Sequence, residues 1–308
     1  MPARSSIALA IVTGEDAPEL TANGQAVRTA LEDRGFSARP AVWSDPTVDW
    51  SAFDALLLRS CWDYHASPEA FRSWLQRCET QGLAILNPPA VVRWNIHKFY
   101  LRDLATAGVA IPETAWIEQG SDVSLADVLD DHGWTEAVVK PAIGAKSANA
   151  FRTSIEAAGN EQDRFEALLA KQDVLVQTFV PEVTDGERSL VFFGGDYSHA
   201  SISRPADDDF RTHPNYGGTT EPFTPDSELI DQAQTVLATA ADILGIDTAT
   251  LPYARIDGID RSGTFHLMEL ELIEPYLGLD RADGALERFV EEVETALQAH
   301  PRLTDSPV

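Results

Sequence analysis

Lysine is almost missing from this chain. Only four lysines occur among 308 residues: Lys98, Lys140, Lys146 and Lys171. Lysine and arginine together number 23 against 49 aspartates and glutamates, which gives a formal net charge of −26. So acidic a chain repels phosphate backbones, which argues against nucleic acid as a partner. If a general pressure has removed lysine, the four that remain are strong candidates for function.

The acidic residues are spread along the whole chain rather than gathered in a tail. Such a distribution, together with the preference for arginine, predicts adaptation to a cytoplasm rich in salt. Salt at high concentration screens the mutual repulsion of these charges. We therefore expect a halophilic protein that loses stability when it is dialysed into dilute buffer.

Cysteine is scarce as well, and long apolar runs are absent. Cys61 and Cys78 give no disulfide framework and fit a reducing compartment. The apolar run near the start is short and is soon followed by acidic residues, so we expect neither a signal peptide nor a membrane span. We predict a cytoplasmic protein without a membrane partner.

The first third of the chain alternates strands and helices. Residues 5 to 13 read as a buried strand that ends at Gly14, and a helix closed by Gly35 follows. Further elements are predicted as strands at 37–43, 53–60 and 84–87 and as a helix near 67–80. This alternation is typical of a parallel α/β sheet, in which active residues lie at the carboxyl ends of strands. Arg59 lies at such an end.

The rest of the chain predicts a mixed arrangement with two β-hairpins. The hairpins cover 188–205, with a turn at Gly194-Gly195-Asp196, and 253–275. An acidic loop, "ADDDFRTHPNYGGT", follows the first hairpin. The remaining predictions are helices at 94–108, 161–171, 226–244 and 282–299, and strands at 137–144 and 174–180.

The stretch "FHLMELELIEPYLGLD" reads as a buried strand but carries carboxylates. Side chains alternate along a strand, so Glu269 and Glu271 share one face. In apolar surroundings they repel each other and lose hydration, which raises their pKa values or requires a cation between them. The wet face of an edge strand is the alternative interpretation.

Asp257, in "YARIDGID", lies one strand earlier and could join these glutamates on one face. Oxygen ligands of this kind suit Mg²⁺, which is usually held by one or two carboxylates plus substrate phosphates. The scattered histidines and the lack of ligand spacing give no indication of zinc.

Several cations could contact phosphate. Lys140 ends the apolar run "AVVK", where it could hold phosphate or merely extend to water. Lys98, on a predicted helix, leaves the same choice open. Further candidates sit around the acidic loop, namely Arg204, Arg211, Asn215 and the pair Gly217-Gly218. Long irregular loops are often functional, although these arginines could simply neutralise the neighbouring aspartates. Cations and carboxylates together indicate nucleotide chemistry, without a Walker A or protein-kinase motif.

The order of these segments resembles the ATP-grasp superfamily, and most of all its glutathione-synthetase-like branch. Seven segments carry the resemblance over nearly the whole chain: "LLLRSCWDY", "NPPAVVRWNIHKFYL", "VVKP", "LVQTFVPEVTDGERSLVFFGGD", "SRP" with "FRTHPNYGG", "RIDG" and "MELELIEP". It implies an ATP-grasp fold of the α/β (α+β) class in three parts. These are an N-terminal parallel α/β domain (1–95), a small lid subdomain (96–180) and a C-terminal antiparallel-sheet subdomain (181–308).

The resemblance also implies roles for individual residues. Lys98 and Lys140 would bind ATP phosphates, Gln177, Thr178, Phe179 and Val180 the adenine, and Glu187 the ribose. Arg204 and Arg211 would meet the transferred phosphate, which makes them, with Lys140, the catalytic candidates. Asp257, Glu269 and Glu271 would hold two Mg²⁺ ions, with Mn²⁺ as an alternative metal. The acceptor side would take Arg59, Asn215, Gly217, Gly218 and Glu274, although Glu274 could equally be exposed on the surface.

Enzymes of this kind activate a carboxylate as an acylphosphate, which an amine-type nucleophile then attacks. We thus expect an ADP-forming ligase acting on a small amino acid or peptide-like molecule, with Cys61 packed rather than catalytic. The alternatives are a ligase that modifies a protein or carrier-protein terminus and a non-catalytic nucleotide-binding regulator. The choice between a monomer and a homo-oligomer stays open.

Three departures from the branch matter. Glu271 replaces the usual metal asparagine, and "AIGAKSANA" follows Lys140 in place of a glycine-rich flap. The segment "RSCWDYH" lacks the proline-rich acceptor pattern of bacterial glutathione synthetases. It looks closer to the branch that contains the cyclo-ligase of cycloserine biosynthesis, which suggests an intramolecular cyclisation.

Overall fold

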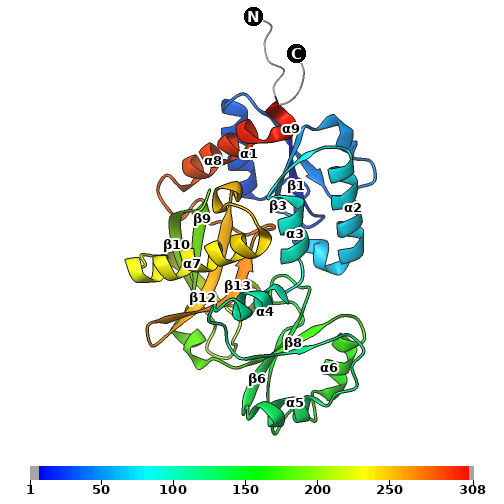
Figure 1. Ribbon diagram of the computed structural model, residues 1–308, viewed down its shortest axis with the longest axis vertical. Coiled ribbons are helices and arrows are strands. Elements are labelled where there is room, and N and C mark those ends of the chain that lie inside the picture. Colours follow the sequence, from blue (N-terminus) through cyan, green and yellow to red (C-terminus); the bar gives the residue numbers. More distant parts are fainter. Residues whose placement is uncertain (1–6, 305–308) are drawn as a thin grey trace, which may run out of the picture.

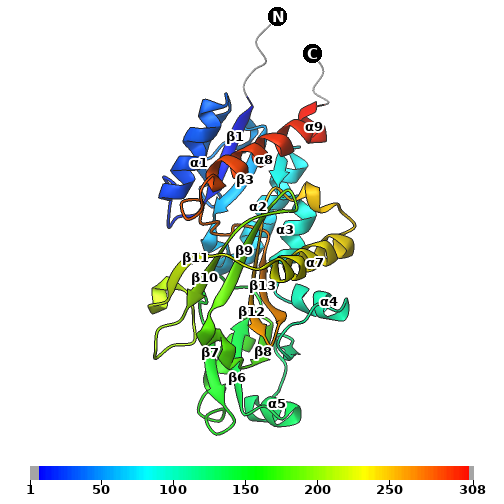
Figure 2. The same ribbon diagram turned by 90° about the vertical axis from the view of Figure 1, so that its left-hand side faces the viewer.

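The computed structural model describes residues 7–304, and three sheets follow one another along its long axis (Figures 1 and 2). Sheet A lies at the end of the molecule that holds α1 and α8, sheet C in the middle and sheet B at the far end. The mixed α/β class is confirmed. Among residues 7–304 no helix is both long and apolar enough to cross a membrane.

Sheet A is parallel, as predicted, with the strand order β2-β1-β3-β4. Its strands are β1 (Ala8–Thr13), β2 (Ser37–Val42), β3 (Ala55–Ser60) and β4 (Ala84–Leu86). Residues 5 and 6 of the first predicted strand lie outside the described residues. The helices α1 (Ala22–Asp33) and α2 (Pro68–Thr80) flank the sheet.

The last long helix, α8 (Ala285–Ala299), also packs on sheet A. Phe289, Val290 and Val293 join Val27 and Leu31 of α1 in one buried cluster. The end of the chain therefore completes the core of the first sheet, although we predicted it as part of the C-terminal subdomain. A short helix, α9 (Pro301–Thr304), follows.

Sheet B is antiparallel with the order β5-β8-β6-β7. Its elements are β5 (Thr114–Ile117), β6 (Glu136–Pro141), β7 (Phe151–Ser154), β8 (Val174–Thr178) and the helices α5 (Leu125–His132) and α6 (Gln162–Leu169). The sequence did not predict β5, α5 or β7, because runs of four to eight residues are too short to show a period. A separate apolar cluster, which includes Phe165, Val139 and Val176, holds this unit together.

Sheet C is antiparallel with the order β11-β10-β9-β12-β13, and α7 (Ser227–Leu244) covers one face. Its strands are β9 (Glu187–Phe193), β10 (Asp196–Arg204), β11 (Thr219–Phe223), β12 (Ala254–Arg261) and β13 (Thr264–Glu271). Both predicted hairpins are present, and the end of the acidic loop adds β11. β13 is at the edge of the sheet, so the alternative interpretation of this segment as an edge strand was correct about its position.

The single helix predicted at 94–108 was wrong. The chain forms α3 (Pro89–Asn95) and α4 (Tyr100–Thr106), with a break between them. Within the break the backbone N–H of Lys98 donates to the Ala142 carbonyl (2.8 Å) instead of to its own helix. This tertiary bond fixes Lys98 at a helix end beside sheet B.

Sheets A and C are joined by buried polar bonds. The Tyr253 hydroxyl lies 3.1, 2.8 and 3.0 Å from the carbonyl oxygens of Leu58, Leu86 and Ile273. Nearby, the Asn87 amide donates to the carbonyls of Tyr253 (2.9 Å) and Leu272 (2.7 Å). Both side chains are fully buried. They therefore fix the end of β3 against the segment that follows β13.

Replacing Tyr253 by phenylalanine should lower the free energy of unfolding by about 1–3 kcal/mol, because a buried acceptor loses its donor. Denaturant unfolding of Tyr253→Phe measures the loss. Tyr197→Phe is the matched control, because the Tyr197 ring is only half-buried and its hydroxyl has no hydrogen-bond partner within residues 7–304. Equal stability of the two variants would contradict this role of Tyr253.

Candidate active site

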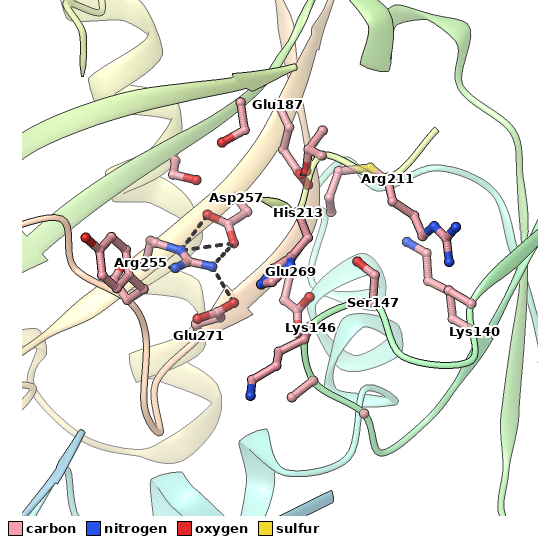
Figure 3. Close-up of a pocket in the computed structure, with 18 of the residues that line it drawn as sticks. Lys140, Lys146, Ser147, Glu187, Arg211, His213, Arg255, Asp257, Glu269 and Glu271 are labelled. Carbon is pink, nitrogen blue, oxygen red and sulfur yellow. Dashed lines mark hydrogen bonds and ion pairs between the residues drawn. The ribbon is translucent and has the colours of Figure 1, made fainter. Parts of the chain in front are cut away.

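A cavity of about 550 Å³ opens between sheets B and C (Figure 3), and Trp62 and Tyr64 are among the residues that line it. Thirteen of the predicted site residues line it: Lys98, Lys140, Gln177, Thr178, Phe179, Val180, Glu187, Arg211, Asn215, Asp257, Glu269, Glu271 and Glu274. Four predicted residues do not, namely Arg59, Arg204, Gly217 and Gly218. The volume lies within the range of ligand pockets.

The carboxylates come together through the register of β12 and β13. Asp257 lies opposite Glu269, and Arg255 lies opposite Glu271. Arg255 donates from Nε to Asp257 Oδ1 (2.9 Å) and from Nη2 to Asp257 Oδ2 (2.9 Å), and it also pairs with Glu271 (Figure 3). The sequence analysis missed Arg255. Its position two residues before Asp257, and so on the same strand face, was the available signal.

The charges of these carboxylates depend on their partners. Burial raises the pKa of Glu271 to about 8, in spite of the neighbouring Arg255. Burial acts in the same direction on Glu269, but the ion pair with Lys98 outweighs it and lowers the pKa of Glu269. The two glutamates on this strand face therefore differ in how readily they ionise.

The donor set suits Mg²⁺ bound together with phosphate. Within residues 7–304 no three acidic, histidine or cysteine side chains form a ready metal cage, and Arg255 takes up the space between Asp257 and Glu271. Mg²⁺ needs only one or two carboxylates when substrate phosphates supply the other oxygens. Asp257, Glu269 and Glu271 fit that requirement in number and in chemistry.

Three of the four lysines line this one cavity. Lys140 Nζ donates to Gln177 Oε1 (2.8 Å), and burial lowers the pKa of Lys140. Burial also opposes the charge of Lys98, yet its ion pair with Glu269 raises the pKa of Lys98. In Figure 3 Lys140 and Arg211 lie across the view from Arg255. Lys140 and Arg211 thus lie on a different wall from the carboxylates that pair with Arg255.

Lys146 is the third of these lysines and was given no role by the sequence analysis. Its Nζ pairs with Asp16 Oδ2 (2.8 Å) and lies 5.2 Å from the centre of the Trp62 ring. Lys146 and Ser147 both adopt left-handed backbone conformations, with φ of 55° and 54°. Such conformations are uncommon for residues other than glycine and concentrate at functional sites. The segment between β6 and β7 therefore crosses the cavity toward sheet A without being glycine-rich.

The loop 206–219 contributes Arg211 to the cavity. Arg211 donates from Nε and Nη2 to Asp209 (2.9 and 2.6 Å) and lies 3.4 Å from the centre of the Tyr216 ring. Arg211 therefore lines the cavity and also neutralises an aspartate, while its contact with phosphate stays a prediction. Gly218 shapes the loop, because a Cβ there would lie 2.1 Å from the Thr212 carbonyl oxygen. Arg204 instead pairs with Glu221, on the neighbouring outer strand.

Glu187 is held within the cavity by this loop. Its Oε2 accepts a hydrogen bond from the Thr212 hydroxyl (2.6 Å). Burial, followed by the charge of Asp257, raises the pKa of Glu187 to about 7. A group that donates hydrogen bonds, such as a sugar hydroxyl, would stabilise its ionised form.

The acceptor-side predictions have different outcomes. Arg59 is 4% exposed and lies behind the cavity wall, where Nη1 donates to the Pro275 carbonyl (3.2 Å). Glu274 is 8% exposed and lines the cavity, so surface exposure is excluded. Burial, then the charge of Glu271, raises the pKa of Glu274 well above its usual range. Cys61 is packed in the core, as expected.

Comparison with known proteins supports the resemblance that the sequence segments predicted. Residues 9–87 match the family described as the N-terminal domain of D-cycloserine synthetase DcsG. The cycloserine biosynthesis protein DcsG of Streptomyces lavendulae is 33% identical over 276 residues, which cover 86% of this chain and 90% of that protein. The chain belongs to the DcsG family of ATP-grasp ligases. The predicted resemblance is confirmed.

Solved structures agree with membership of the DcsG family. The crystal structure of D-cycloserine synthetase DcsG has a TM-score of 0.85 at 29% identity and covers 94% of this chain and 99% of that one. A D-alanine–D-alanine ligase from Bacillus anthracis, with a TM-score of 0.71 at 16% identity over 98% and 100% of the two chains, shares the fold. A glutathione synthetase of Bradyrhizobium diazoefficiens is 26% identical over 63% of this chain and 58% of its own length.

Proposed function

We propose that the protein is an ADP-forming ligase that activates the carboxylate of a small amino acid or peptide-like substrate as an acylphosphate. An amine-type nucleophile then attacks this acylphosphate. One observation carries the proposal: in an ATP-grasp ligase, three lysines and the carboxylates of β12 and β13 face one cavity. Electrostatic complementarity of this kind is the main requirement of phosphoryl transfer.

The residues divide the work of binding ATP. Gln177, Thr178, Phe179 and Val180 would receive the adenine and Glu187 the ribose. Lys98 and Lys140 would hold the phosphates, and Arg211 would face the phosphate that is transferred. Asp257, Glu269 and Glu271 would hold two metal ions. Mg²⁺, or Mn²⁺ in its place, supplies charge neutralisation at the phosphates when it is bound.

Arg255 connects this set of residues. It neutralises Asp257 and Glu271 and also lines the cavity. Its guanidinium would there be available to donate to a developing oxyanion. We propose no direct ligand contact for Arg59, Arg204, Gly217 or Gly218, which do not line the cavity.

Cyclisation within one substrate molecule is the more specific form of the proposal. It is supported by the similarity to the cycloserine biosynthesis protein over most of both chains. Joining two molecules, or modifying a protein or carrier-protein terminus, are the alternatives. The regulator alternative is disfavoured, because the lysines and all three metal-type carboxylates are retained in one cavity.

Purified protein with Mg²⁺, ATP and pooled amino acids tests the proposal. We expect ADP and phosphate to be released only when the amino acids are present, and mass spectrometry of the products then separates a dehydrated single substrate from a joined pair. Tight ATP binding without release under any substrate would support the regulator instead.

We also propose that the protein works in a salt-rich cytoplasm, on the basis of its net charge of −26. The Debye length falls from about 10 Å at 0.1 M salt to about 3 Å at 1 M, so self-repulsion fades as salt is added. The melting temperature should therefore rise steadily between dilute buffer and molar potassium chloride. A melting temperature independent of salt would contradict this proposal.

A further inference from the structure

The segment that follows β13 is fixed by donors from elsewhere in the chain. Three successive carbonyl groups accept hydrogen bonds from side chains of other segments: Ile273 from Tyr253 (3.0 Å), Glu274 from Trp62 Nε1 (3.0 Å) and Pro275 from Arg59 (3.2 Å). Tyr253 and Arg59 are buried. The backbone of Glu274 is therefore held from both sides, and its side chain is presented to the cavity in a fixed position.

The carboxylate of Glu274 differs from the other acidic groups in the cavity. Asp257 and Glu271 pair with Arg255, Glu269 pairs with Lys98, and Glu187 accepts from Thr212. Glu274 has no hydrogen-bond or ion-pair partner for its carboxylate within residues 7–304, although it is only 8% exposed. Burying a carboxylate without a partner is costly, so a cation from outside the chain would be strongly favoured there.

Tyr64 provides a second polar group in the same part of the cavity. Its side chain is 6% exposed and lines the cavity, and its hydroxyl has no hydrogen-bond partner among residues 7–304. Burial, then the charge of Glu274, raises the pKa of Tyr64, as expected for neighbouring groups. The ring packs on Phe71 at 5.1 Å between centroids, which fixes its orientation. The Trp62 ring already has the cation Lys146 at 5.2 Å from its centre, which shows that aromatic surface beside Tyr64 accepts a positive charge.

These surroundings select the charge of what binds. Glu271 and Glu269 add negative charge near Glu274, and their partners Arg255 and Lys98 offset part of it. An ammonium group has both a charged acceptor in Glu274 and a phenolic oxygen in Tyr64 available.

We propose that Glu274 binds the ammonium group of the substrate, with the Tyr64 hydroxyl as a second contact, and so restricts the enzyme to carboxylic acids that carry a free amine. Arg59 and Trp62 act as positioning residues that hold the Glu274 backbone. This inference rests on the proposed ligase function and specifies its substrate class.

The test uses pairs of acids that differ only in the amine, such as alanine in both configurations against propionate and serine against 3-hydroxypropionate. Substrate-stimulated ADP release is measured for the wild type, Glu274→Gln and Glu274→Asp, and calorimetry records the binding of the same probes to the protein saturated with Mg²⁺ and ADP. Glu287→Gln removes an equal charge from an exposed site on α8 and is the matched control.

The wild type and Glu287→Gln should prefer the amine-bearing acid. In Glu274→Gln the KM for the amine-bearing acid should rise about 10- to 100-fold, which is the range for a lost hydrogen bond to a charged group. The change in kcat should be smaller. Glu274→Asp should recover part of the affinity, and the affinity for ADP should not change. Tyr64→Phe should show a smaller rise in KM.

Equal use of both members of each pair by the wild type would overturn the inference, as would an unchanged KM in Glu274→Gln. If the proposed ligase function is wrong, the result is different, because no acid then stimulates ADP release from the wild type. In that case the calorimetric binding of the paired acids still tests the role of Glu274. Amine-dependent binding that is lost in Glu274→Gln supports the inference, and binding without amine dependence, or no binding of any probe, overturns it. If Glu274→Gln does not fold, the wild-type comparison of the paired acids decides alone.

Discussion

Replacing Glu269 by glutamine should lower substrate-dependent ADP release on the order of 10³-fold, at the upper end of the loss expected for one electrostatic group of an active site. Glu269 stands opposite Asp257 in the β12–β13 register and shares its strand face with Glu271. Glutamine keeps the shape but removes the charge needed to hold Mg²⁺ at the phosphates. The free energy of unfolding should fall only modestly, because Glu269 is partly open to the cavity.

The experiment on Glu269 has two readouts. Steady-state ADP release gives the loss of turnover, and titration of Mg²⁺ against nucleotide binding shows whether metal affinity is what has changed. Glu118→Gln, at an exposed position just beyond β5, is the matched control. Wild-type turnover with an unchanged Mg²⁺ requirement in Glu269→Gln would refute the assignment of this carboxylate.

Replacing Lys140 by alanine should lower kcat/KM for ATP on the order of 10²- to 10³-fold, because a cation held at the phosphates is lost. Lys140 is fixed by its hydrogen bond to Gln177 on the neighbouring strand β8 (2.8 Å), so its ammonium is positioned before the nucleotide arrives. Lys98, which is tied to Glu269, cannot replace it.

Lys171 offers a close control for Lys140, since it is exposed and does not line the cavity. Lys171→Ala should keep the wild-type rate, and both variants should melt within a few degrees of the wild type. If the two lysine variants were equally active, Lys140 would have no part in binding ATP.

Much of the carboxylate cluster could be predicted from the sequence. Strand alternation places Glu269 and Glu271 on one face, and a hairpin with a short turn places Asp257 opposite Glu269. The scarcity of lysine was equally informative, because it directed attention to Lys140 and Lys98, which line the cavity.

Other features depend on contacts that local sequence does not contain. The break before α4 follows from the bond between the Lys98 backbone and Ala142, on a distant segment. The ion pairs of Arg255 require the register of β12 and β13, which no single strand specifies. Its position at the end of β3 suggested a site role for Arg59 but said nothing of its depth, and the side chain lies behind the cavity wall.

The division into domains at residues 95 and 180 remains a prediction. Sheet B lies wholly within the predicted lid range, whereas α8 packs on sheet A although it comes from the last third of the chain. A helix packs where its apolar face can be buried against the apolar face of a sheet. The order of elements in the sequence does not show which sheet that is.

The most direct test of the account follows an oxygen atom. Amino acids labelled with ¹⁸O in their carboxylates are supplied with Mg²⁺ and unlabelled ATP, and the released phosphate is analysed by mass spectrometry. Activation as an acylphosphate predicts that one ¹⁸O moves from the carboxylate into each phosphate, with ADP as the other product. Phosphate without the label, or the release of AMP and pyrophosphate, would contradict the proposed reaction.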